Sequence, residues 1–175
     1  MSESRSHAYA GALLAVARTE GSLAEVEDEL FRFARLLEAN DELRTTLTDA
    51  KLPVSRRQQI VEDLLEGRAN PTTTALVSMV VGTGRSRDLP AIIDELVKLS
   101  AAEGNKEIAE VRSAVELTDD QKQRLTSALE RKTGKKIELK VIIDSTVLGG
   151  LVAQVGDTVI DGSIKTRLQQ LKSAF

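Results

Sequence analysis

The spacing of apolar residues first departs from a helical pattern near Gly104, and this change constrains the fold more than any other feature. Before it, apolar residues recur every three or four positions, as they do from Leu23 to Leu37. After it, apolar and polar residues alternate, as they do from Ile137 to Ile143. The first pattern places apolar side chains on one face of a helix, and the second places them on one face of a strand. The chain is therefore predicted to be helical first and to contain its strands last.

Six helices are predicted before Gly104. Ser22 with Glu25, and Ser55 with Gln58, have the spacing of a capping box, so these pairs are predicted to begin the second and fourth helices. Pro71 follows an asparagine and favours the start of the fifth helix, because proline at the first helical position loses only an amide that would be unpaired there. The spacing thus predicts an N-terminal six-helix bundle over residues 1–105.

A small α/β unit is predicted over residues 106–175. A strand is expected over 109–117, and Thr118 with Gln121 forms a capping box for a helix that Gly134 ends. A strand over 137–143, a hairpin over 151–160 and a final helix follow. The predicted fold class is α+β, predominantly α.

The chain offers few groups for chemistry. It has no cysteine and a single histidine, His7, which excludes thiolate sites and paired-histidine metal sites. The stretch "GTGRSRD" lacks the third glycine of a dinucleotide fingerprint, and "GGLVAQVGD" lacks the lysine of a phosphate-binding loop. Asp157 and Asp161 have no nucleophile or metal ligand beside them, so they are interpreted as a turn residue and a helix cap. We expect no catalytic residue, no metal and no cofactor.

The charge balance disfavours two classes of partner. The net charge is −3, and the basic pairs Arg56-Arg57 and Lys135-Lys136 have no interleaved aromatic residues, so we expect no nucleic acid partner. No stretch approaches the ~20 apolar residues of a membrane-spanning helix, so no direct membrane insertion is expected. A regulatory or nucleic-acid-binding α+β module stays open as the alternative, and it requires the basic residues to cluster on one face.

The stretch "LGGLVAQVGDTVIDGSIKTRLQQL", from residue 148 to 171, resembles the C-terminal signature of a known family. That family is the delta subunit of bacterial F-type ATP synthases, whose mitochondrial counterpart is the oligomycin-sensitivity-conferring protein. Its pattern is a Gly-Gly-aliphatic start, a Gly-Asp turn, Asp-x-Ser and a leucine-spaced helix. The matching positions are Gly149, Gly150, Gly156, Asp157, Asp161, Ser163, Leu168 and Leu171. "YAGALLAVA" and "VRSAVELTDDQ" also resemble family segments, so the likeness spans nearly the whole chain.

The resemblance implies a non-catalytic stator subunit, present once per complex, at the cytoplasmic face of the bacterial plasma membrane. The bundle would bind the N-terminal helices of the alpha subunits of the catalytic head, and the C-terminal unit would bind the end of the b-subunit stalk. In the family the first and fifth helices form the alpha-binding groove. The candidates here are Tyr9, Ala12, Leu13, Val16, Leu76, Met79 and Val80. About half of these are expected to be ordinary core residues instead.

Overall fold

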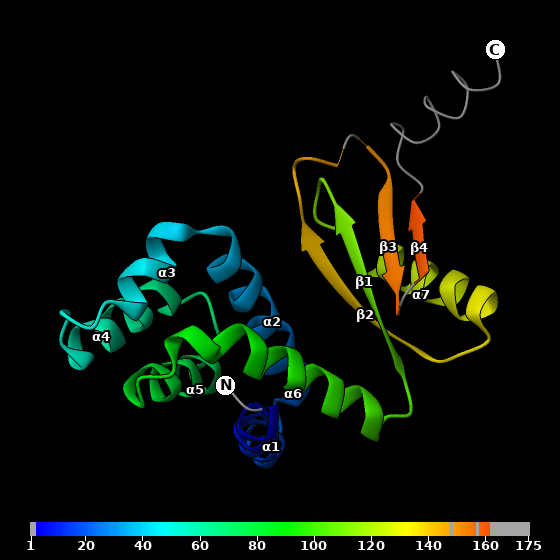
Figure 1. The fold of residues 1–175 in the computed structure, drawn as a ribbon. Helices are drawn as coiled ribbons and strands as arrows, with labels where there is room; N and C mark the ends of the chain where they lie inside the picture. Colours follow the sequence, from blue (N-terminus) through cyan, green and yellow to red (C-terminus); the bar gives the residue numbers. More distant parts are fainter. Residues whose placement is uncertain (1–2, 148, 157, 162–175) are drawn as a thin grey trace. The chain divides into compact units, whose positions relative to one another are not determined.

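The computed structural model describes residues 3–147, 149–156 and 158–161. The chain divides into two compact units, Met1–Ser100 and Ala101–Phe175. The described residues form seven α-helices and one four-stranded sheet (Figure 1). The chain is therefore α+β and predominantly α, as the change in apolar spacing predicts.

The first unit is helical throughout its described part. Its elements are α1 (Glu3–Thr19), α2 (Leu23–Ala39), α3 (Asp41–Thr48), α4 (Val54–Leu65), α5 (Pro71–Gly82), the short 3₁₀ helix η1 (Ser86–Asp88) and α6 (Leu89–Glu103), whose last residues pass into the second unit. The helix α5 begins at Pro71 as predicted, and Asn70 caps it, because the Asn70 side chain accepts a hydrogen bond of 2.9 Å from the Thr72 amide.

Both capping boxes predicted in this unit are wrong. Ser22 precedes α2, but its side chain makes no capping hydrogen bond. The helix α4 begins at Val54, directly after Pro53, so Ser55 lies inside the helix and cannot cap it. Pro53 has a φ of −53° in extended backbone and already fixes the entry to the helix. Capping-box spacing alone therefore does not locate these two helix starts.

Each helix of the first unit contributes an apolar face to one core. The helix α5 is buried on most sides, which agrees with its nearly continuous apolar sequence. The helix α6 buries a stripe at helical spacing. The largest fully buried side chains of the unit are Phe31, Leu13, Leu30, Leu37, Leu47, Leu89, Ile92, Ile93, Leu96, Val26, Val61 and Val77.

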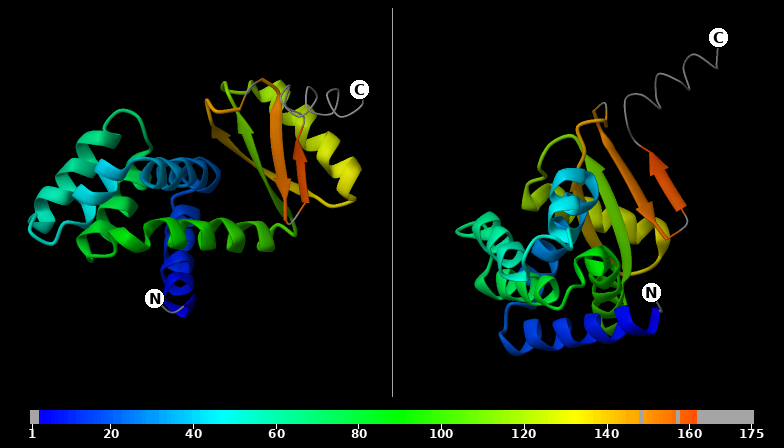
Figure 2. Two further views of the ribbon diagram at one scale, coloured as in Figure 1. Left: turned by 45° about the horizontal axis from the view of Figure 1, so that its top comes forward. Right: turned by 60° about the vertical axis from the view of Figure 1, so that its left-hand side comes forward.

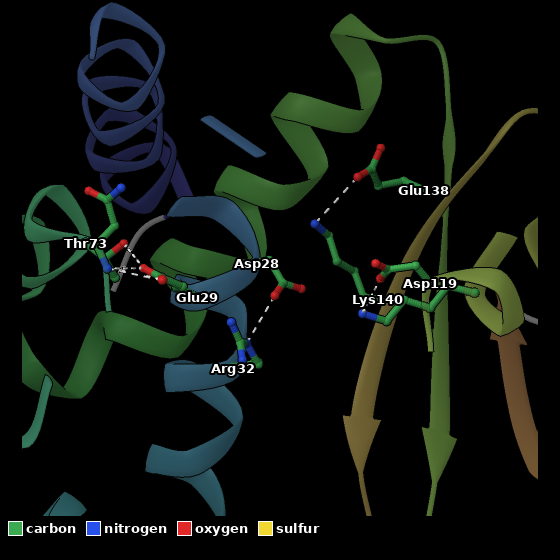
Figure 3. A network of polar contacts seen from close by, with 9 residues as sticks. Asp28, Glu29, Arg32, Thr73, Asp119, Glu138 and Lys140 are labelled. Atoms are coloured by element: carbon green, nitrogen blue, oxygen red, sulfur yellow. Dashed lines mark hydrogen bonds and ion pairs between the residues drawn. The ribbon is translucent and has the colours of Figure 1, made fainter. Parts of the chain in front are cut away.

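A carboxylate from α2 holds the first turn of α5 (Figure 3). Glu29 accepts hydrogen bonds from the backbone amide of Asn70, at 2.9 and 3.1 Å, and from the hydroxyl of Thr73, at 2.5 Å. Thr73 is fully buried. A negative charge at this position also meets the positive end of the α5 dipole. Glu29 therefore fixes where α5 starts against α2.

The second unit is a mixed sheet with one helix. Its elements are β1 (Glu107–Ser113), α7 (Asp119–Thr133), β2 (Ile137–Ile143), β3 (Leu151–Val155) and β4 (Thr158–Asp161), and the strand order is β2-β1-β3-β4. The strands β1 and β2 are parallel and α7 connects them, whereas β3 is antiparallel to β1 and to β4. The capping box of Thr118 and Gln121 and the left-handed Gly134 after α7 are both confirmed.

The first strand ends earlier than predicted. It stops at Ser113, and Val115 is 67% exposed. The Ser113 hydroxyl donates to the Val115 carbonyl at 2.6 Å and accepts from the Val115 amide at 3.3 Å. This local turn takes the backbone groups that a longer strand would pair. Leu117 is nevertheless buried, since it packs beneath α7.

The helix α7 lies against one face of the sheet in both views of Figure 2. The side chains between them are aliphatic and come from every described element of the unit. The buried members are Ala109, Val111, Leu117, Leu129, Ile137, Ala153 and Val155. The second unit therefore has a core of its own, as a separate domain requires.

We expect Glu29→Ala to lower the free energy of unfolding by ~1–3 kcal/mol, because it leaves a buried hydroxyl and a backbone amide unpaired. The matched control is Asp28→Ala on the same helix. Asp28 pairs with Arg32 at 3.1 Å, and both side chains are about half exposed. Its loss should cost less than ~0.5 kcal/mol. Urea unfolding followed by circular dichroism measures both, and equal losses would show that the α2–α5 link is unimportant.

Two glycines, one inside α1 and one in the turn after it, should respond with opposite sign to replacement by alanine. A Cβ at Gly11 or at Gly21 would meet no atom within 4 Å, so backbone conformation alone decides the effect. Gly11 lies inside α1, and Gly11→Ala should stabilise by up to ~1 kcal/mol. Gly21 has a φ of +71°, and Gly21→Ala should destabilise by ~1 kcal/mol. Thermal melts would contradict this if both variants moved in the same direction.

Candidate functional site

The predicted groove residues of α1 divide into two sets. Leu13 is 1% exposed and belongs to the core. Tyr9 is half-buried, Ala12 is exposed and Val16 is 42% exposed, so these three form a stripe on the accessible side of the helix. The guanidinium carbon of Arg85 lies 5.8 Å from the centre of the Tyr9 ring. This distance allows a cation–π contact between α1 and the loop after α5.

The predicted residues of α5 divide in the same way. Leu76 and Val80 are buried, at 4% and 0% exposure, whereas Met79 is 44% exposed. The apolar sequence of α5 could not distinguish them, because residues on both sides of the helix are apolar. The accessible part of the predicted surface therefore consists of Tyr9, Ala12 and Val16 on α1 and Met79 on α5.

The structure also contains a groove that the sequence did not indicate. It lies between α4 and α5, which run side by side in Figure 1, and has a volume of about 870 Å³. Glu62, Asp63 and Glu66 line it from the α4 side. Exposed residues of α5 line the other side, among them Ala75 and Met79. Met79 is the one residue of the predicted set that lines this groove.

Polar contacts join α4 and α5 at the groove. The Gln58 side-chain amide donates to the Ser78 carbonyl at 3.1 Å, and the Ser78 hydroxyl donates to Glu62 at 2.8 Å. Gly82 ends α5 near Gln58, since a Cβ there would lie 2.6 Å from the Gln58 side-chain nitrogen. These contacts hold the two walls in a fixed register. The sequence signal that could have located them is the position of Gln58 and Glu62 one helical turn apart.

The glycines of the C-terminal signature sit at bends. Gly149 and Gly150 have φ values of +66° and +82° between β2 and β3, and Gly156 has +55° at the β3–β4 hairpin. Residues other than glycine rarely adopt this left-handed backbone conformation, which explains why glycine occupies these positions. Asp161 is the last residue of β4. Four further signature positions lie outside the described residues: Asp157, Ser163, Leu168 and Leu171.

Within the described ranges, no three acidic or histidine side chains are grouped so that they could hold a metal ion. In the same part of the chain, none of the helices is long and apolar enough to cross a membrane. The described surface features that can receive a partner are the groove between α4 and α5 and the exposed apolar side chains of α1 and α5.

Known proteins with similar sequences point to one family. The delta subunit of ATP synthase from Streptomyces avermitilis is 45% identical over 159 residues, which is 91% of this chain and 58% of that protein. The delta subunit from Nocardia farcinica is 41% identical over 161 residues, 92% of this chain and 60% of that protein. This chain therefore spans less than two thirds of the length of these relatives.

The fold is shared with a chain in the cryo-electron microscopy structure of the mitochondrial ATP synthase hexamer of Toxoplasma gondii. The TM-score is 0.56 at 22% identity, and the match covers 97% of this chain and 96% of that one. The family model described as ATP synthase delta (OSCP) subunit matches residues 6–175, which include both compact units. This chain belongs to the ATP synthase delta (OSCP) subunit family.

Proposed function

We propose that this chain is a non-catalytic peripheral-stalk subunit, or stator, of an F-type ATP synthase. It links the catalytic head to the stalk, so that proton-driven rotation is coupled to ATP synthesis and does not turn the head. The family match across residues 6–175 is the observation that carries this proposal. Because the chain has two compact units, it can bind one partner through each.

The six helices of residues 1–105 act as a bundle that binds the N-terminal helices of the alpha subunits. An amphipathic helix is recognised by apolar positions on a helical surface, spaced by three, four and seven residues. The stripe of half-buried Tyr9 and exposed Ala12 and Val16 has this spacing, and Met79 adds an exposed apolar side chain on α5. Leu13, Leu76 and Val80 are buried, so they stabilise the bundle that carries these accessible residues.

Residues 106–175 bind the C-terminal end of the b-subunit stalk. Two strands at the edges of the sheet carry exposed apolar side chains, Ile143 at 56% and Val159 at 60%. Exposed apolar groups at a sheet edge are suited to a partner, since natural edges are otherwise protected. The protein serves once per complex, peripherally, at the cytoplasmic face of the bacterial membrane.

We expect the full chain to bind a peptide from the N-terminus of the same organism's alpha subunit, and Val16→Asp to weaken this binding at least ~10-fold. A charge placed in an apolar contact loses its hydration without a partner. Leu36→Asp is the matched control, because Leu36 on α2 is 43% exposed and lies outside the proposed surface. Calorimetric titration of the three proteins measures the affinities.

Equal weakening by the two substitutions would reject the α1 surface. Absence of binding by the folded, unsubstituted chain would reject the assignment of the alpha subunits to the first unit. A third titration, with a peptide from the C-terminal end of the b subunit, tests the second unit independently. Its affinity should be the same for Val16→Asp and for the unsubstituted chain.

A further inference from the structure

We propose that the groove between α4 and α5 is a second docking surface of the first unit, and that it binds a basic amphipathic helix. This inference does not rest on the α1 stripe of Tyr9, Ala12 and Val16, and Met79 is the one residue that the two proposed surfaces share. Four observations carry it: the acidic wall of the groove, the absence of a counter-charge, the apolar opposite wall and the shape.

The wall formed by α4 is acidic. Glu62, Asp63 and Glu66 all line the groove and are exposed, and Glu62 and Glu66 are one helical turn apart. Like charges at this spacing repel each other by ~0.2–0.5 kcal/mol. No lysine or arginine is among the described residues that line the groove. The wall is therefore a site of concentrated negative charge.

Among the described residues, none of these three carboxylates forms a salt bridge with a lysine or an arginine. Glu62 accepts from the Ser78 hydroxyl at 2.8 Å, and Asp63 accepts from the Gln59 amide at 2.8 Å, so both partners are neutral. Other acidic residues of the first unit do have basic partners, as Asp28 has Arg32 and Glu38 has Arg35. The uncompensated charge favours a cationic ligand.

The exposed residues of the wall formed by α5 are apolar. Pro71, Ala75 and Met79 are exposed at intervals of four residues and all line the groove. They span ~12 Å along the axis at 1.5 Å per residue, or about two turns. Methionine adapts its shape to different apolar partners. This wall offers a stripe on which the apolar face of a helix can lie.

The two walls together define the partner. It is a helix of at least ~three turns, matching the 12 residues of α4 and of α5. Its apolar residues, spaced by three and four, contact Ala75 and Met79, and its lysines or arginines face α4. A nucleic acid would meet like charge here. A bound metal ion is disfavoured, since no three acidic or histidine side chains of the described residues are grouped so that they could hold one.

The test uses the full chain and two synthetic 15-residue amphipathic peptides. Both have leucines at helical spacing, and the flanking positions are lysine in one and glutamate in the other. We expect the lysine peptide to bind. Its affinity should fall as the salt concentration is raised, because the attraction is partly between exposed charges. Amide shifts in nuclear magnetic resonance spectra should map its contacts to α4 and α5. The glutamate peptide should not bind.

The decisive variant is E62Q/D63N/E66Q, which keeps the size of each side chain and removes the charge. It should weaken binding of the lysine peptide ~10-fold at low salt, because the attractions of the three carboxylates together can contribute that much to the affinity. The control E20Q/E42Q/E116Q removes the same net charge from exposed positions outside the groove, and should change binding less than ~2-fold. Equal weakening by the two variants would overturn the proposal in favour of general charge attraction.

A second arm separates this surface from the one on α1. Val16→Asp should leave the affinity for the lysine peptide unchanged. Displacement of the lysine peptide by saturating alpha-subunit peptide would overturn the assignment of a separate surface. Loss of alpha-subunit binding in Val16→Asp, with the lysine peptide still bound, would support two surfaces on one bundle.

Discussion

The hydrogen bonds of Glu29 to the first turn of α5 fix the helix on which the first unit depends. One carboxylate satisfies the Asn70 amide and the Thr73 hydroxyl, so the start of α5 is held against α2. From that start, α5 buries six of its 12 residues and presents Met79 outward. If α5 began at another residue, its side chains would be rotated relative to the core, and different residues would be buried and exposed.

Two structural requirements therefore conflict in the helix α5. Core packing favours an apolar helix on all sides, while a binding surface needs some of that apolar area left accessible. Contacts with α4 reconcile them, because Gln58 and Glu62 bind Ser78 and hold the exposed side of α5 beside an acidic wall. The acidic residues beside the exposed apolar stripe limit its nonspecific association with other proteins.

Residue spacing predicted the elements well where the signal is local. Alternation located β2 over 137–143, and the Thr118–Gln121 box located the start of α7. It failed where a competing local contact decides the outcome. The Ser113 hydroxyl ends β1 early, and Pro53 displaces the expected cap of α4. The groove was missed for another reason, since Glu62 and Met79 become neighbours of one cavity only after α4 and α5 pack.

The strand order β2-β1-β3-β4 has a consequence for how the second unit is made. The central strand β1 is synthesised first, yet both of its neighbours, β2 and β3, come later. During translation β1 must wait for some forty further residues before both of its edges are paired, which is roughly two to eight seconds at ordinary elongation rates. The helices of the first unit precede β1 in the chain, so their synthesis is complete while β1 is still unpaired. A nascent chain of this protein thus carries an already synthesised bundle ahead of an open strand, whose exposed edges are a natural point for a chaperone to act.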